Sequence, residues 1–211
     1  MIMQNKINYS LLFENKLKEF EKKGVKPTLL LHACCAPCSS YVLEYIAHRF
    51  NLTLYFYNPN IAPAEEYDFR FDELQRLLCE VGYPNVRTIR EEYRPEEFEE
   101  IAKGLEEEPE GGARCYKCYR LRLEKTAKKG AMGGFDYFTT TLSISPHKNA
   151  EWLNRIGLEL EEKHGIAYLC SDFKKKGGYQ RSIALSREHN LYRQDYCGCI
   201  YSKINRDNER N

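Results

Sequence analysis

The sequence predicts an open α/β fold, built on a mostly parallel sheet with helices on both faces. Two observations predict it. Short apolar runs such as PTLLLHA and IAYLCS have the continuous hydrophobicity of strands that are buried on both faces. Longer segments with apolar residues at helical spacing alternate with these runs, as expected where helices connect parallel strands. The 211 residues fit a single domain, 1–211, with a core of its own.

Taken in order, the chain begins with an amphipathic helix. Ser10 precedes apolar residues at helical spacing, and Gly24 marks the end of the helix. Changes of periodicity and turn residues separate the elements that follow. The predicted strands are 27–33, 52–60 with its turn, 85–89, 135–142 and 166–171. The predicted helices after them are 39–50, 64–82, a helix from about Pro95, 119–131, and 144–165 with its leading loop.

In such sheets ligands bind beyond the carboxyl ends of the strands. Three groups of cysteines fall there. They are CCAPC (Cys34, Cys35, Cys38) after the first strand, CYKC (Cys115, Cys118) at the start of a helix after the acidic loop 104–113, and CGC (Cys197, Cys199) in the C-terminal segment. That segment, 173–211, is predicted to be an irregular tail. We expect its part 173–200 to fold back over the site as a lid.

The charges of the chain are nearly balanced. There are 32 Lys plus Arg and 31 Asp plus Glu, which excludes a uniformly polycationic binder but permits separate charged patches. Residues 91–110 are acidic and the C-terminal half is basic, so a basic face for a polyanion is an alternative to an ordinary solvated surface. The first ten residues lack the features of an export signal, and no apolar run reaches the roughly 18 residues of a membrane span. We therefore expect a cytoplasmic protein without a membrane partner.

The nine cysteines favour metal ligands or redox groups over a disulfide framework, because the chain shows no secretion signal. Seven belong to the three groups above, and we expect the other two, Cys79 and Cys170, to be core residues. An adjacent pair plus a CxxC offers four thiolates from two turns, as a [4Fe–4S] cluster requires. The same spacing suits tetrahedral zinc, so spacing alone leaves iron–sulfur and zinc open.

The remaining clustered thiols suit redox chemistry or further metal binding. A disulfide across one intervening residue closes a strained ring that is easily reduced, and Gly198 lets the backbone bend that far. Cys197 and Cys199 are therefore a candidate redox-active pair, with metal ligation as the alternative. Cys38 stands at the start of a helix, where the helix dipole lowers a thiol pKa. It suits a second metal ion or an accessory thiol.

Four ordered motifs resemble a known family. They are LLLHACCAPCSSYVLE, RCYKCYRLRLEKTA, DYFTTTLSISPHKNAE and GGYQRSIALSREHNLYRQDYCGC. Together they resemble the QueH family of epoxyqueuosine reductases, from about residue 28 to residue 200. The resemblance implies an oxidoreductase that works without cobalamin and reduces epoxyqueuosine in tRNA to queuosine, the last step of queuosine biosynthesis. It also implies a sheet similar to that of the adenine nucleotide alpha hydrolases.

The resemblance further implies roles for individual residues. The ligands of a [4Fe–4S] cluster correspond to Cys34, Cys35, Cys115 and Cys118, and a redox-active disulfide corresponds to Cys197 and Cys199. A second iron or other metal ion, with Cys38 as its candidate ligand, and an unidentified electron donor are also expected. The candidate substrate contacts are Ser143, Ser145, His147 and Lys148, for which helix capping is the alternative. The basic run 174–181 is the candidate for the tRNA backbone.

Two other functions compete with this one. An ATP-dependent tRNA-modifying enzyme would hold phosphate in the first strand–helix loop, but HACCAPCSS lacks the glycines of such a cradle. A zinc-stabilised RNA-binding module would use the same cysteines without redox chemistry.

Overall fold

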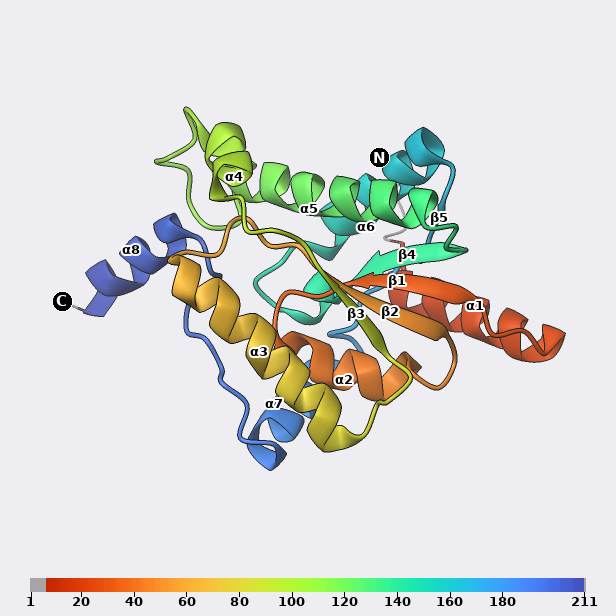
Figure 1. Ribbon diagram of the computed structural model, residues 1–211. Coiled ribbons are helices and arrows are strands. Elements are labelled where there is room, and N and C mark those ends of the chain that lie inside the picture. The colour runs from red at the N-terminus through yellow and green to blue at the C-terminus, as the bar shows by residue number, and fades with distance from the viewer. Residues whose placement is uncertain (1–6, 211) are drawn as a thin grey trace, which may run out of the picture.

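The computed structural model describes residues 7–210, and Figure 1 shows them as one sheet surrounded by helices. The first six residues, part of the segment in which no export signal is expected, and Asn211 lie outside the described residues. Across the described part of the chain, five strands form the sheet in the order β3-β2-β1-β4-β5, and each neighbouring pair is parallel. The α/β fold predicted from the sequence is confirmed.

The elements agree with the predicted periodicity to within a few residues. The strands are β1 (Thr28–His32), β2 (Asn51–Phe56), β3 (Arg87–Arg90), β4 (Tyr137–Thr140) and β5 (Ala167–Tyr168). The helices before β4 are α1 (Tyr9–Lys23), α2 (Ala36–Ile46), α3 (Ala64–Val81), α4 (Pro95–Ala102) and α5 (Ala113–Met132). The 3-10 helix η1 (Thr141–Ile144), α6 (Ala150–His164), α7 (Gly178–Glu188) and α8 (Ile200–Arg210) follow.

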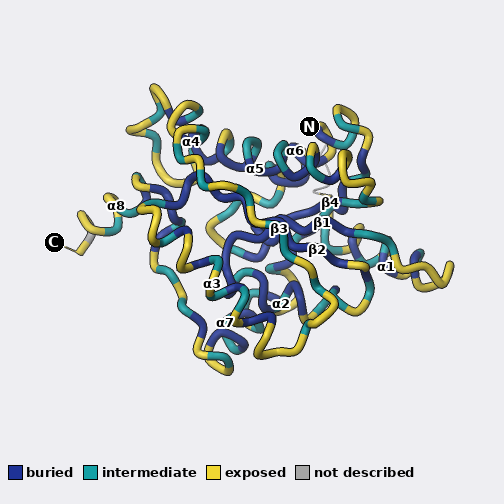
Figure 2. The backbone as a smooth tube through the Cα atoms, viewed as in Figure 1, coloured by how far each residue is buried: buried dark blue, intermediate teal, exposed yellow. Residues whose placement is uncertain are grey.

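Helices cover both faces of the sheet, as predicted (Figure 1). Successive side chains of β1 point to opposite faces. Leu29 and Leu31 therefore pack in one buried cluster with residues of α1, α2 and α3, whereas Leu30 packs in a second cluster with residues of α5 and α6. The strands and the inner sides of these helices are the buried part of the backbone in Figure 2. Burial on both faces explains why the strand sequences are continuously apolar.

The centre of the sheet determines where a ligand can bind. β1 pairs with β2 on one side and with β4 on the other. The strand order changes direction at the β1–β4 pair, and open parallel sheets bind ligands at such a switch point beyond the carboxyl ends. β1 ends at His32, two residues before Cys34, and β4 ends at Thr140, directly before η1. The CCAPC turn and the loop that follows η1 therefore meet at this edge.

The C-terminal segment differs from the prediction. The sequence predicts an irregular tail over 173–211, but this is wrong for α7 and α8, which are helical. α7 packs against α2 and buries Ser182, Leu185 and Ser186, so its helix is stabilised by tertiary packing that the polar sequence does not reveal. Residues 189–199 between the two helices contain neither helix nor strand. We call this segment the strap.

Three local predictions also change. Cys79 is exposed on α3, so its assignment to the core is wrong, and Cys170 is half-buried. The buried stripe of α3 is formed by Tyr67, Arg70, Leu74, Leu77 and Leu78, and position 79 falls outside it. α5 begins at Ala113, so it includes CYKC at its start, as expected, and is longer than the predicted helix 119–131. Within residues 7–210, no helix combines the length and the apolar character needed to cross a membrane.

Candidate active site

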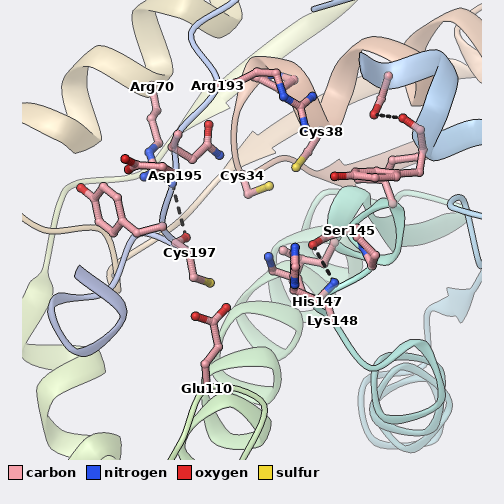
Figure 3. A pocket seen from close by; sticks show the side chains of 18 of the residues that line it. Cys34, Cys38, Arg70, Glu110, Ser145, His147, Lys148, Arg193, Asp195 and Cys197 are labelled. Carbon is pink, nitrogen blue, oxygen red and sulfur yellow. Dashed lines mark hydrogen bonds between the residues drawn. The ribbon is translucent and has the colours of Figure 1, made fainter. Parts of the chain in front are cut away.

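A cavity of about 630 Å³ lies at the carboxyl ends of β1 and β4. Its walls come from the β1–α2 turn, η1 and the loop between η1 and α6, helices α3, α5 and α7, and the strap. Figure 3 shows Cys34 and Cys38 from the first wall and Cys197 from the strap around one space, with His147 and Lys148 on a further side. Thiols from distant parts of the chain thus share one cavity.

The CCAPC turn brings three sulfur atoms together. The Sγ atoms of Cys34, Cys35 and Cys38 lie within 4.8 Å of one another, and 3.7 Å separates those of Cys34 and Cys35. Cys35 has extended backbone and precedes α2, whose first turn contains Pro37. Cys38 lies three residues after Cys35, about one helical turn, so its side chain lies on the same side of the helix as that of Cys35. Hydrogen bonding with Cys35 holds the pKa of Cys34 well below its usual range, and this bond raises the pKa of Cys35 to about 11.

The CYKC pair lies in the first turns of α5, and both thiols are buried. The backbone N–H of Gly111 donates to Cys115 Sγ over 3.2 Å. Burial raises the pKa of both thiols, that of Cys118 to about 11. Cys115 packs in the same buried cluster as Cys34 and Cys35. The tightest sulfur group nevertheless contains Cys38, and not Cys115 or Cys118.

The strap carries the CGC pair to the cavity. Cys197 lines the cavity, Cys199 is buried in a small cluster with Cys118, and both are free thiols. Gly198 has a φ of +120°, a backbone conformation that side chains rarely adopt. Ser202 fixes the turn, because its Oγ accepts from the Cys197 N–H (3.0 Å) and its N–H donates to Cys199 Sγ (3.4 Å).

Arg70 of α3 holds the strap from the side of the sheet. Its side chain is 2% exposed and its Nε donates to the Glu66 carboxylate over 2.7 Å. Nη1 donates to the carbonyl oxygen of Cys197 over 3.4 Å, and the guanidinium lies 5.2 Å from the centre of the Tyr196 ring. Gln194 adds a second tie, because its Nε2 donates to Cys35 Sγ over 2.9 Å. The strap is thus bound to the CCAPC turn and to α3.

The structure separates the four residues that the sequence predicts as substrate contacts. Ser145, His147 and Lys148 line the cavity. Ser143 is buried behind it, where its Oγ lies 3.0 Å from that of Ser171. Asn149, rather than one of the serines, caps the N-terminus of α6. Three of the four predicted residues therefore face the space in which a substrate would lie.

Lys148 is the cation of this loop that faces the thiols. Burial opposes its charge, but the thiols of Cys197, Cys38 and Cys34 hold the pKa of its ammonium group above its usual value. A lysine in this position supplies positive charge to the cavity at neutral pH.

The basic run 174–181 is largely compensated by acidic side chains. Lys174 pairs with Asp172 (2.7 Å), Lys176 pairs with Glu14, and Arg181 pairs with Glu44 (2.6 Å) and Glu188 (2.7 Å). Lys175 is exposed and has no such pair among the described residues. Two of these partners, Glu14 and Glu44, lie far away in the sequence, and the run is less electropositive than its composition indicates.

Arg122 is a further residue of the site that sequence reasoning does not single out. It lies on α5, is 2% exposed and lines the cavity. The signal was present, because Arg122 follows Cys118 by four residues and must share its helix face. The thiols of Cys118, Cys34 and Cys197 are the acidic groups that act on its charge, against the effect of its burial.

A thiolate-bound metal group fits these surroundings. Thiols are the ligands that iron–sulfur clusters and zinc require, and seven of them converge from three chain segments at this end of the sheet. A buried guanidinium is stabilised by a negative charge nearby, which metal-bound thiolates would supply to Arg122. The three Sγ atoms of Cys34, Cys35 and Cys38 are placed where they could hold a metal ion.

Comparison with known proteins decides the family. Residues 29–205 match the family model described as "Epoxyqueuosine reductase QueH". The chain belongs to the QueH family. Relatives named "Epoxyqueuosine reductase QueH" occur in Streptococcus pyogenes serotype M1, Staphylococcus epidermidis and Thermotoga maritima, at 44%, 41% and 38% identity. These similarities cover 93%, 94% and 85% of this chain and 78%, 86% and 92% of the respective relatives.

The QueH match confirms the resemblance that the four sequence motifs indicate. The matched residues, 29–205, include the three cysteine groups, the loop from Ser145 to Lys148 and the strap. The cavity is therefore built entirely from the part of the chain that is shared with the QueH family.

Proposed function

We propose that this protein is an epoxyqueuosine reductase that converts epoxyqueuosine in tRNA to queuosine. The observation that carries the proposal is the thiol-lined cavity at the switch point of the sheet, in a chain of the QueH family. Removing the epoxide oxygen to leave an alkene consumes two electrons and two protons and releases one water molecule. The site must therefore supply electrons, protons and a pocket for one nucleoside.

For the metal group, we propose Cys34, Cys35, Cys115 and Cys118 as the ligands of a [4Fe–4S] cluster. Cys38 would then be left for a second iron or other metal ion, in keeping with its sulfur contacts. When bound, such groups supply single electrons and a Lewis acid for an oxygen atom. Cys115 and Cys34 pack in one buried cluster, which supports a ligand set drawn from both segments.

For electron storage, we propose the Cys197/Cys199 pair. Oxidation of the two thiols to a disulfide releases two electrons and two protons, which equals the demand of one turnover. Cys197 lines the cavity and Cys199 packs beside Cys118. The pair therefore adjoins both the cavity and Cys118, one of the thiols proposed to hold the cluster. An electron donor, still to be identified, would reduce the disulfide again.

For substrate binding, the cavity has the size of a small-molecule site and can take one nucleoside that is turned out of the anticodon loop. Tyr179 and Tyr196 line it and offer aromatic faces for stacking. Ser145, His147 and Lys148 provide hydrogen-bond donors for the base or a neighbouring phosphate. Of the basic run, Lys175 is the residue best placed for the tRNA backbone, because its neighbours are already paired.

The test is anaerobic reconstitution with iron and sulfide, followed by assay on epoxyqueuosine-containing tRNA with a strong reductant. We expect a brown protein and multiple turnovers. Cys197→Ser should keep the colour but lose multiple turnover, whereas Cys79→Ser, at an exposed cysteine of α3, should behave as the wild-type protein. If Cys197→Ser retained multiple turnover, the electron-storage role would be wrong.

A zinc-stabilised RNA-binding protein is the second candidate, because three thiols within 4.8 Å of one another also suit tetrahedral zinc. Metal analysis separates the two functions. A colourless protein that carries stoichiometric zinc and reduces no epoxyqueuosine after reconstitution would favour this alternative over the reductase.

A further inference from the structure

Arg122 is a buried cation held by neutral partners. Its Nε donates to His32 Nε2 (3.3 Å) and its Nη2 donates to the Asn58 carbonyl oxygen. Both partners are fully buried at the carboxyl edge of β1 and β2. Among residues 7–210, no carboxylate lies within ion-pair distance of this guanidinium. The charge is therefore desolvated without the partner that buried arginines usually have.

The two other buried arginines are held by other groups. Arg70 has the Glu66 carboxylate at 2.7 Å. Arg114 donates to two backbone carbonyl groups, those of Leu105 and Glu106, and its guanidinium lies 4.3 Å from the centre of the Tyr201 ring. The acidic groups that act on Arg122 are thiols, those of Cys118, Cys34 and Cys197. Arg122 has neither the carboxylate of Arg70 nor the carbonyl pair of Arg114, and ionised sulfur is the counter-charge that the cavity beside it offers.

The orientation of Arg122 is fixed by the groups around His32. Nδ1 of His32 lies 2.9 Å from Thr140 Oγ1, and Nε2 lies 3.1 Å from the Tyr57 carbonyl oxygen and 3.3 Å from Arg122 Nε. Burial lowers the pKa of His32 to about 3, and the charge of Arg122 contributes to this shift. His32 is thus a neutral support that holds the guanidinium beside the thiols.

We propose that Arg122 is a positioning residue that raises the reduction potential of the thiolate-bound redox group. Each electron that enters such a group adds one negative charge, and a fixed positive charge in a buried site stabilises that charge more than water would. Arg122 lines the same cavity as Cys34 and lies one helical turn after Cys118 on the buried face of α5, so proposed ligands from two segments are near it. This inference rests on the proposed function, because it requires these thiols to hold a redox group.

The test compares reduction potentials in the reconstituted protein, measured by anaerobic redox titration. Arg122→Met removes the charge at similar length, and we expect a shift to more negative potential. Arg122→Lys keeps the charge and should remain near the wild-type value. The matched control is Arg120→Met on the same helix, where an exposed arginine pairs with Glu159. It should leave the potential unchanged.

A second variant and a second readout guard against loss of folding. Asn58→Asp keeps an acceptor for Arg122 and adds a negative charge, while it loses the donor to the Ala33 carbonyl, so the potential should again become more negative. The metal-dependent rise in Tm should also be smaller in Arg122→Met than in the wild-type protein, because without metal the wild-type protein has a buried cation that lacks an anion.

The outcomes separate this inference from the proposed function. An unchanged potential in Arg122→Met, or an equal negative shift in Arg122→Lys, would overturn the inference. If Arg122→Met does not fold, Asn58→Asp decides the matter. An unchanged potential in Asn58→Asp would then overturn the inference. A more negative potential in Asn58→Asp, together with a wild-type potential in Arg122→Lys, would support it. Failure of the wild-type protein to bind iron and sulfide would overturn the proposed function itself.

Discussion

The wall of the cavity that carries CCAPC and the wall formed by the strap are held in different ways. The first continues the sheet: the Ala33 N–H donates to the Tyr55 carbonyl (2.9 Å), and Asn58 Nδ2 donates to the Ala33 carbonyl (3.0 Å). The strap has no helix or strand over residues 189–199. Side chains of Arg70 and Gln194 tie it to its surroundings.

This difference separates two roles in the proposed chemistry. The thiols proposed as metal ligands lie on elements whose order depends on the whole core, so they open only when the protein unfolds. The Cys197/Cys199 pair lies on a segment without helix or strand, held by separate hydrogen bonds to α3, α7 and Ala62, so we expect it to open locally at a smaller cost. A dithiol that must be reduced again by a donor is suited to the more easily opened segment.

The largest expected effect is the loss of stability when β1, the strand that leads into the CCAPC wall, is altered. Leu31 of β1 is fully buried, and Leu31→Ala should destabilise the protein by about 2–5 kcal/mol, through lost burial and the cavity that remains. Urea unfolding measures this loss. Leu158→Ala on α6, where the side chain is 42% exposed, removes the same atoms and should cost less than about 0.5 kcal/mol. Equal losses would contradict the assignment of β1 to the core.

The next largest effect is expected on the stability of the strap. Arg70→Met removes the partner of Glu66 and the donor to the Cys197 carbonyl, which should cost about 1–3 kcal/mol. Hydrogen exchange should become faster across residues 189–199 while the amides of β1 keep their protection. Arg155→Met, an exposed arginine of α6, serves as the control. A matching loss of protection in β1 would show that the two walls are one cooperative unit.

A smaller effect is expected at Gln194. Gln194→Leu removes the donor to Cys35 Sγ at similar volume, and should make opening of the strap easier by about 1 kcal/mol. The measurement is again hydrogen exchange of the strap, with the exposed Gln180 of α7 changed to Leu as control. Equal exchange in both variants would mean that this hydrogen bond does not hold the strap.

The smallest effect concerns pH. A hydrogen bond with Arg206, followed by one with Arg210, holds the pKa of Asp195 below its ordinary value of 3.8. Because the folded pKa is the lower one, the pairing stabilises the docking of α8 on the strap above pH 3.8. This stabilisation is lost as the pH falls through the folded pKa. NMR signals of α8 should report this loosening in acid, and Asp195→Asn should remove the pH dependence. An identical acid response in that variant would assign the transition to another group.

The sequence predicts those parts of the site whose residues lie close together in the chain. The CCAPC turn follows a strand of apolar residues and begins a helix within a few positions, so its place at the sheet edge follows from the pattern PTLLLHA and the turn itself. Four ordered motifs were enough to indicate the QueH family, which the match over 29–205 confirms. The helical state of α7 and the exposure of Cys79 could not be predicted, because both depend on which helix face meets the sheet.

The sequence by itself determined the alternation of strands and helices, the family, and the three groups in which thiols are available, because each depends on residues within one or two turns of chain. Only the tertiary structure decided which groups meet. It brought Cys197 of the strap to the cavity of Cys34 and Cys38, paired Lys176 and Arg181 of the basic run with distant acids, and left Arg122 buried near the thiols. Such contacts join positions up to 162 residues apart. They are fixed by packing of whole layers, which no local pattern records.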